Sequence, residues 1–572
     1  MDSIDIWYLK EVYVWRTAAS MTWYLLSLPV LTVVYAFTAQ LNLLHPLTWI
    51  TDTFSAMLSV YFISTVGIII AANGGLAWLS ASTYSVVPNV TDIRLRKVAW
   101  LLTPARLVHI SVYMAVGFVI SCCSSMYAGN RFSGFVKYAE YESDIVYLNE
   151  CHVMFVLYGM YTGLYFCCQF YLYQLNYLQF PIIQREKFFQ VRSEVASMLM
   201  RCVTETLHQM KYFYLLYFLL GHIPRGWILH SLNLMLSPDA QPLDTVWGLL
   251  DVGVAIQVLL LGCFLNYTWS LSVLLYRVYH TERLEFPVDS AFDSYKNKSL
   301  LSAVSCQNKA LLQHLGYLDL LHLARFSPVR RRQVLSLSQP GGHPHTWNKL
   351  SAACLGDIDL LTTQVQESNW SAMAGVAHKP PSVSDAGEGS TLRYRNSAGV
   401  NATFTGPKEG EGRLTTPAPT PSTPWTDKVT SFLAQKPLIG FFFRQLPDAK
   451  SRQLFANSQK QIWAIDALSY LVAASFTEDK FGIVQRSLPA ILASLLNLHE
   501  NVEKHFKLSS SSSRRTQKVS PYPSDAPLRH QLHSTLKTSI YRIVNVFGTH
   551  LMDVPLSAEC RKKLSPFIDF RE

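Results

Sequence analysis

Long apolar runs without charged side chains dominate the first half of this 572-residue chain. No Asp, Glu, Lys or Arg occurs between Arg16 and Asp52, or between Asp52 and Asp92. A helix needs about 20 consecutive, mainly apolar residues to cross the hydrocarbon core of a bilayer. Because both intervals are longer than this, the first half of the chain is predicted to cross a membrane repeatedly.

Six helical spans are expected. The fifth of them in chain order has a weaker sequence signal, because Pro224 and Arg225 interrupt its apolar run at 212–236. Either this span continues, with the long Arg225 side chain extending to the membrane surface, or a short helix ends there in an interfacial segment. The other five spans follow directly from apolar runs and cover residues 18–41, 54–79, 107–128, 151–180 and 252–276.

The charges of the loops predict how these spans are oriented. Lys and Arg gather in the N-terminal arm and in the segments after the second, fourth and sixth spans. The loop after the first span has neither, the loop after the third is mainly acidic, and the loop after the fifth has none beyond Arg225. Positive loops stay on the cytosolic side, so both termini are expected to face the cytosol or nucleoplasm. The alternation also supports the fifth span.

Arg225 and Asp251 form a candidate structural ion pair, since both are expected near the luminal face. In the fourth span, Gly159 and Gly163 lie four residues apart. This spacing either permits close contact with another helix or is a chance occurrence in a long span.

The cysteines do not have the spacing of a metal site or a disulfide framework. Cys122 or Cys123 is expected near the same oxidising face as Cys151, where a disulfide could form. The favoured interpretation is that the cysteines are small apolar residues.

From Arg277 onward the chain has the charge density of a soluble protein, with several expected helices. One covers 305–326, Ser327 and Pro328 begin a short basic helix, and an amphipathic helix covers 453–476. The predicted fold class is all-α: a six-helix transmembrane domain followed by a helical cytosolic or nucleoplasmic domain that a disordered linker interrupts. The expected boundaries are a transmembrane domain at 1–280, a helical segment at 287–370, the linker at 376–425 and a C-terminal helical domain at 430–572.

The linker holds three Thr-Pro pairs, at Thr416, Thr420 and Thr423. A proline-directed kinase acting there would add negative charge and switch a contact by repulsion. Ordinary linker composition explains the same residues equally well.

Three consecutive aromatic residues follow the linker, Phe441, Phe442 and Phe443, flanked by Lys436 and Arg444. Such a segment is either part of a core or a candidate membrane-surface contact. The core is the favoured interpretation.

Enzymatic signatures are not found in the sequence. It contains no GxSxG, HExxH, P-loop or dinucleotide motif, and His343 with His345 in a Pro/Gly turn is predicted to be structural rather than metal-binding. No cofactor or metal is therefore expected. The net charge of +10 is assigned mainly to the loops, not to direct nucleic-acid binding. A multi-span transporter, or a membrane enzyme of the endoplasmic reticulum without a known motif, stays as an alternative.

Specific segments carry a family resemblance. The run from Leu335 to His345, LSLSQPGGHPH, resembles a signature of the Nuclear Division Cycle transmembrane nucleoporin family. So do SFTED at 475–479, SLPAI at 487–491 and LKTSIYR at 536–542. The resemblance covers essentially the whole chain and is weakest in the linker.

This resemblance implies a non-enzymatic anchor in the nuclear envelope, at the pore membrane, that supports the assembly and insertion of nuclear pore complexes. Its implied partners are the lipid bilayer of the pore membrane, scaffold nucleoporins of the inner ring, Aladin and other pore-membrane proteins. The family has no catalytic residues to carry over.

Overall fold

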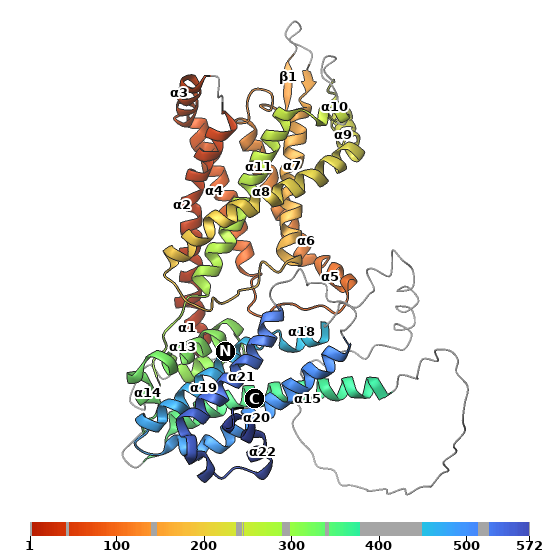
Figure 1. Cartoon of the computed structure of the whole chain (residues 1–572). Coiled ribbons are helices and arrows are strands. Elements are labelled where there is room, and N and C mark those ends of the chain that lie inside the picture. The colour runs from red at the N-terminus through yellow and green to blue at the C-terminus, as the bar shows by residue number, and fades with distance from the viewer. Residues whose placement is uncertain are drawn as a thin grey trace, which may run out of the picture.

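The structure is a computed structural model and describes residues 3–41, 45–138, 146–235, 243, 245–288, 298–337, 342–377, 449–512 and 525–570. The described residues form two helical bodies (Figure 1). Long, roughly aligned helices of the first half stand on a compact bundle formed by the second half. The all-α fold class is confirmed; the only strands described are a short antiparallel pair, β1 (Val136–Tyr138) and β2 (Val146–Leu148).

Among the residues that the structure describes, five helical segments of the membrane half are long and apolar enough to cross a bilayer, by length and composition. They correspond to the five spans that the apolar runs predicted. They are Ile4–Ala39 (α1, Ser3–Trp7; the π-helical turn η1, Tyr8–Tyr13; and α2, Val14–Ala39), Val60–Ala81 (α4), Pro104–Ser125 (α6), Glu150–Leu172 (α7) and Val252–His280 (α11).

The second span begins later than its apolar run. A separate helix, α3 (Pro46–Met57), occupies the start of that run. The Ser59 hydroxyl then accepts a hydrogen bond from the Phe62 amide at 3.2 Å and caps α4. An N-cap of this kind ends one helix and begins another within a continuous apolar sequence.

The apolar run expected as the weaker fifth span begins in the last part of α8 (Lys187–Leu220) and continues in α9 (His222–Leu232), which follows directly. At about 1.5 Å per residue, 34 residues give a helix of about 50 Å, and it crosses the bundle obliquely (Figure 1). Pro224 falls in the first turn of α9, where proline is tolerated. Buried polar residues attach α8 to α11: the Asn266 amide donates to Thr206 at 3.0 Å and to Gln209 at 2.8 Å.

Glycines bring α6 and α7 into close contact. A Cβ added at Gly159 would lie 2.5 Å from the Ser121 hydroxyl oxygen and 2.7 Å from the Gly117 carbonyl oxygen. One added at Gly163 would overlap the carbonyl oxygen of Tyr113. The spacing of Gly159 and Gly163 therefore serves close helix packing.

Smaller elements connect the spans at both ends. On the side of the C-terminal bundle lies α5 (Arg94–Leu101), and at the opposite end α3, β1, α9 and α10 (Val246–Leu249) gather (Figure 1).

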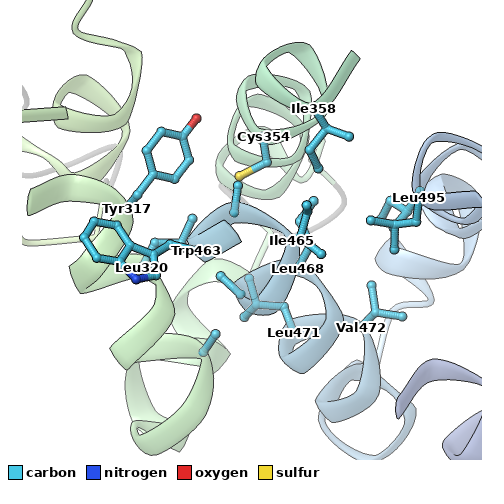
Figure 2. Close-up of a cluster of buried hydrophobic side chains, with 14 of the residues drawn as sticks. Tyr317, Leu320, Cys354, Ile358, Trp463, Ile465, Leu468, Leu471, Val472 and Leu495 are labelled. Atoms are coloured by element: carbon cyan, nitrogen blue, oxygen red, sulfur yellow. The ribbon is translucent and has the colours of Figure 1, made fainter. Parts of the chain in front are cut away.

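The second half forms a bundle around α19, which is buried on most of its surface. Figure 2 shows Tyr317 and Leu320 of α13 on one side of α19, and Ile358 of α15 and Leu495 of α20 on others. The helices of this half are α12 (Leu300–Ser305), α13 (Ala310–Phe326), α14 (Pro328–Val334), α15 (His345–Ala377), α18 (Ala449–Phe455), α19 (Gln459–Glu478), α20 (Ile483–Ser512), α21 (Asp525–Phe547), the 3-10 turn η3 (Gly548–Asp553) and α22 (Ala558–Ile568).

Two local expectations can be compared with these bounds. Ser327 caps α14 and Pro328 is its first residue, as predicted. The helix expected at 305–326 begins later than predicted: α13 covers Ala310–Phe326 and ends as expected, and Ser305 is the last residue of the preceding helix α12.

Candidate functional site

The N-terminal arm joins the first span to the core of the C-terminal bundle. Ile4, Tyr8 and Val12 are buried in the same hydrophobic cluster as residues of α12, α13 and α19. Asp5 is fully buried and accepts hydrogen bonds from the Cys306 thiol at 3.0 Å and from the Asn308 amide at 3.1 Å. The chain thus enters its first span from within the C-terminal bundle.

Arg16 connects the start of the first span to the end of the last span by hydrogen bonds. Its guanidinium donates to the carbonyl oxygens of His280 at 3.5 Å, Glu282 at 2.8 Å and Arg283 at 3.3 Å. Carbonyl groups at a helix C-terminus have no partner within the helix, and a cation there is also favoured by the helix dipole. Arg16 satisfies both needs.

Aromatic side chains connect the end of η1, the end of α4 and the last turn of α11. The hydroxyls of Tyr13 and Tyr276 lie 3.0 Å apart, and each is 3.1 Å from the carbonyl oxygen of Ala81. Tyr276 also stacks on Tyr84 at 3.9 Å and on His280 at 4.1 Å between ring centroids. Tyrosines of this kind gather where a membrane meets water.

The segment after α7 inserts Phe180 between helices of the C-terminal bundle. The Phe180 ring stacks on His314 of α13 at 6.1 Å and meets the edge of Trp463 of α19 at 5.1 Å. Burial lowers the pKa of His314 to about 4 and keeps its ring neutral. Nearby, the Gln184 amide donates to the Thr281 carbonyl at 2.8 Å and its oxygen accepts from the Arg283 amide at 3.0 Å.

A buried ion pair holds the segment after α11. Asp319 of α13 is fully buried and pairs with Arg330 of α14 at 2.6 Å. Asp319 also accepts from the Phe286 amide at 3.0 Å, and Arg330 donates to the Phe286 carbonyl at 2.6 Å. The junction of the two halves is therefore built from the arm, the two segments that leave α7 and α11, and the helices α13, α14 and α19.

Comparison with known proteins gives the family. A family model described as "Nucleoporin protein Ndc1-Nup" matches residues 11–565. This chain belongs to the Ndc1-Nup family. It is 32% identical to Nucleoporin NDC1 of Danio rerio, over 99% of both chains, and 32% identical to Nucleoporin NDC1 of Homo sapiens, over 99% of this chain and 98% of that protein. With Nucleoporin Ndc1 of Drosophila melanogaster the identity is 22%, over 84% of this chain and 87% of that protein.

Family membership confirms the resemblance that the sequence carried. This Ndc1-Nup member is a transmembrane nucleoporin of the nuclear pore. The apolar helices of its first half support this assignment. The prediction that it is not an enzyme is confirmed as well, since its relatives are named as nucleoporins, which are structural components of the pore.

The predicted ion pair between Arg225 and Asp251 is wrong for this nucleoporin. Arg225 meets Glu150, the first residue of α7, at 3.3 Å, and Asp251 meets Arg131 at 2.6 Å. The reason is local: the Asp251 carboxylate caps α11 through the amides of Gly253 at 2.9 Å and Val254 at 3.2 Å. One oxygen of the Asp251 carboxylate thus caps the helix, and the other pairs with Arg131.

Sequence reasoning missed Arg131 and Glu150 as partners, because both were counted only as loop charges that set the orientation. Both pairs do lie at the end of the spans opposite the C-terminal bundle, which is the shared face that the loop charges predicted for Arg225 and Asp251 (Figure 1).

The remaining candidate residues divide into two groups. Each of the ten cysteines is a free thiol, including Cys122, Cys123 and Cys151, so the disulfide alternative is not formed. The candidate phosphorylation sites Thr416, Thr420 and Thr423 and the candidate membrane contact Phe441, Phe442 and Phe443 lie outside the described residues.

One group of possible metal ligands was not predicted. His499 and Glu503 of α20 and His533 of α21 bring one ligand atom each to within 4.8 Å of one another. His499 and Glu503 are four residues apart, about one helical turn, and this spacing of possible ligands can be seen in the sequence. His533 comes from a different helix, and only the packing of α20 on α21 brings it close to them.

Proposed function

We propose that this nucleoporin anchors the scaffold of the nuclear pore complex to the pore membrane and supports the insertion and assembly of new pores. The observation that carries the proposal is the junction around Arg16, Phe180 and Asp319. Contacts at three separate points join the C-terminal bundle to helices that are long enough to cross a bilayer: those of Asp5 in the arm, of Phe180 after α7 and of Phe286 after α11. A force applied to the bundle by the scaffold would therefore be transmitted to the membrane.

In this proposal both termini face the cytosol or nucleoplasm. The burial of Ile4 and Tyr8 in the core of the C-terminal bundle supports a shared side for the two ends of the chain. The alternation of positive loops supports the cytosolic and nucleoplasmic side. Protease added to sealed nuclear-envelope vesicles should then digest an epitope at the C-terminus; full protection of that epitope until detergent is added would overturn the orientation.

The proposed partners are scaffold nucleoporins of the inner ring, Aladin and other pore-membrane proteins, as the family resemblance implies. Cross-linking mass spectrometry on intact nuclear envelopes tests this directly, since cross-links should connect the C-terminal bundle to these proteins. A tagged full-length chain should give a punctate nuclear rim and co-purify with scaffold nucleoporins. Uniform reticular staining without nucleoporins would instead favour a transporter or an enzyme of the endoplasmic reticulum.

A further inference from the structure

A cavity of about 530 Å³ opens between α7, α8 and α11 of the membrane half. Part of its wall is apolar and includes Phe166, Met198 and Leu274. Its polar part includes Arg201, Glu194 and Arg277. A cavity with an oily wall and charged groups fits a molecule that is itself apolar at one end and charged at the other.

Arg277 is the key residue, because its charge has no partner among the described residues. Its Nε atom is fully buried and makes no hydrogen bond, and no ion pair or side-chain hydrogen bond of its guanidinium is found in the described part of the chain. Tyr84, Glu194, Arg201 and Tyr177 act on it electrostatically, and of these the acidic Glu194 and the basic Arg201 pair with each other at 3.2 Å. A further carboxylate of the cavity, Glu205, accepts a hydrogen bond from Gln169 at 2.7 Å.

The position of Arg277 along its helix limits what can approach it. Arg277 lies in the last turn of α11, which starts at Val252. At about 1.5 Å per residue, it is about 37 Å from the start of the helix, which exceeds the thickness of a hydrocarbon core of about 30 Å. Arg277 therefore lies at the level of lipid headgroups, beside the tyrosine cluster of Tyr84 and Tyr276.

A guanidinium that is partly buried without an acceptor is costly in a membrane protein. Phosphate is the anion that suits it best, since the planar fork of arginine donates two parallel hydrogen bonds to phosphate oxygens. Inorganic phosphate would leave the apolar wall of the cavity in contact with water. A phospholipid would satisfy both parts at once, and basic pockets between transmembrane helices do bind lipid headgroups.

We propose that this cavity is a phospholipid-binding site. The phosphate of the lipid pairs with Arg277, and one acyl chain lies along Phe166, Met198 and Leu274. The remainder of the headgroup faces the Glu194–Arg201 pair at the rim, where both side chains are about half exposed or more.

Three probes added to the delipidated full-length protein in detergent test the site, with native mass spectrometry as the readout. Phosphatidic acid has both the phosphate and the chains, diacylglycerol has only the chains, and inorganic phosphate has only the charge. We expect one molecule of phosphatidic acid to be retained, at least about 10-fold more strongly than diacylglycerol, as the loss of a charge-assisted hydrogen bond implies. Equal retention of diacylglycerol, or equal retention of inorganic phosphate, would overturn the proposal.

Variants identify the residue responsible. Arg277→Gln should lower the retention of phosphatidic acid about 10-fold, and Arg277→Lys should lower it less, because a lysine keeps the charge but not the fork. The matched control is Arg192→Gln, an exposed arginine on α8 that does not line the cavity; its retention should stay unchanged. If Arg277→Gln does not fold, the comparison of the three probes on the unchanged chain still decides whether the cavity binds a phospholipid. Unchanged retention by a folded Arg277→Gln would contradict the site.

Discussion

Arg16 and Asp319 represent two kinds of polar contact at the junction. Arg16 donates to main-chain oxygens, so its contacts depend on the backbone of the segment that follows α11 rather than on particular side chains. Asp319 depends on one side chain, Arg330, and on one amide, that of Phe286. The second kind is more sensitive to mutation, since the loss of one partner leaves a buried charge.

The ion pair between Arg330 and Asp319 gives a direct test of this difference. Arg330→Ala should lower the free energy of unfolding by about 3 kcal/mol or more, because Asp319 is fully buried and would keep only its main-chain donor. The matched control is Arg96→Ala, which removes an arginine that is 65% exposed in its pair with Asp92 and should cost less than about 1 kcal/mol. Denaturant unfolding of the full-length protein in detergent measures both. If both variants lost the same free energy of unfolding, burial would not strengthen the pair between Asp319 and Arg330.

His314 makes the stability of the junction dependent on pH. Its pKa is about 4 in the folded protein because of burial, against an ordinary value of 6.5 in an unfolded chain. The unfolded chain therefore takes up the proton first, so stability should fall as the pH drops from about 6.5 to about 4, by up to about 3 kcal/mol in total. Below that range the contribution of His314 no longer changes.

The measurement is the apparent unfolding midpoint at a series of pH values, for the wild type and for His314→Gln. Other histidines with lowered pKa values, such as His322 and His533, contribute equally to both proteins. The difference between the two curves thus isolates His314. Lys460 and Asp357, the charged groups acting on this ring, stay in place in both. Parallel curves between pH 7 and 4 would contradict the assignment.

At the scale of whole elements, α6 and α7 pack extensively against each other in the membrane half. Gly117, Gly159 and Gly163 allow the two backbones to touch. Association of helices in lipid depends on such packing, because lipid chains are as apolar as the side chains.

A single methyl group should therefore disturb this contact. Gly159→Ala is expected to destabilise the protein by about 1–3 kcal/mol, since its Cβ would overlap Ser121 and the two helices would have to separate. The matched control is Gly67→Ala in α4, whose Cβ would meet no atom within 4 Å; it should be neutral or slightly stabilising. Thermal unfolding in a fixed detergent measures both. A neutral Gly159→Ala would show that α6 and α7 are not in close contact.

The elements also show what the sequence could and could not predict. The spans were predictable because the thickness of the bilayer sets a minimum apolar length, and this length is visible as charge-free intervals. The break between α3 and α4 could not be predicted, since it depends on one serine cap inside an apolar run. The oblique course of α8 was not predictable either, because it follows from buried contacts with α11 such as Gln209–Asn266.

The same limit applies to the candidate site. The loop charges correctly indicated that Arg225 and Asp251 lie at one end of the bundle. Their actual partners, Glu150 and Arg131, are 75 and 120 residues away in the chain, respectively. Such distant partners are fixed by tertiary packing, which a single sequence without a structure does not reveal.

At the scale of the whole molecule, three separate segments of the first half contact the C-terminal bundle. The N-terminal arm, the segment after α7 and the segment after α11 all meet α13 or its neighbours. The C-terminal bundle is thus attached at several points rather than suspended from one linker. This arrangement fits the anchoring role proposed above.

Loosening this attachment should separate membrane insertion from scaffold binding. In the double variant Arg16→Ala with Gln184→Ala, the hydrogen bonds that fix residues 280–283 are lost. We expect amide hydrogen exchange in η1 and in 281–288 to become at least about 10-fold faster, as local opening there becomes easier by about 1.4 kcal/mol or more. Exchange in α4 should not change, and the protein should still insert into the envelope. The recruitment of scaffold nucleoporins to the nuclear rim should fall, because the bundle would no longer be rigidly placed.

Arg96→Ala is the control for the double variant, since Arg96 lies on α5 outside the junction. Normal recruitment despite faster exchange would show that rigidity of the junction is not needed for anchoring.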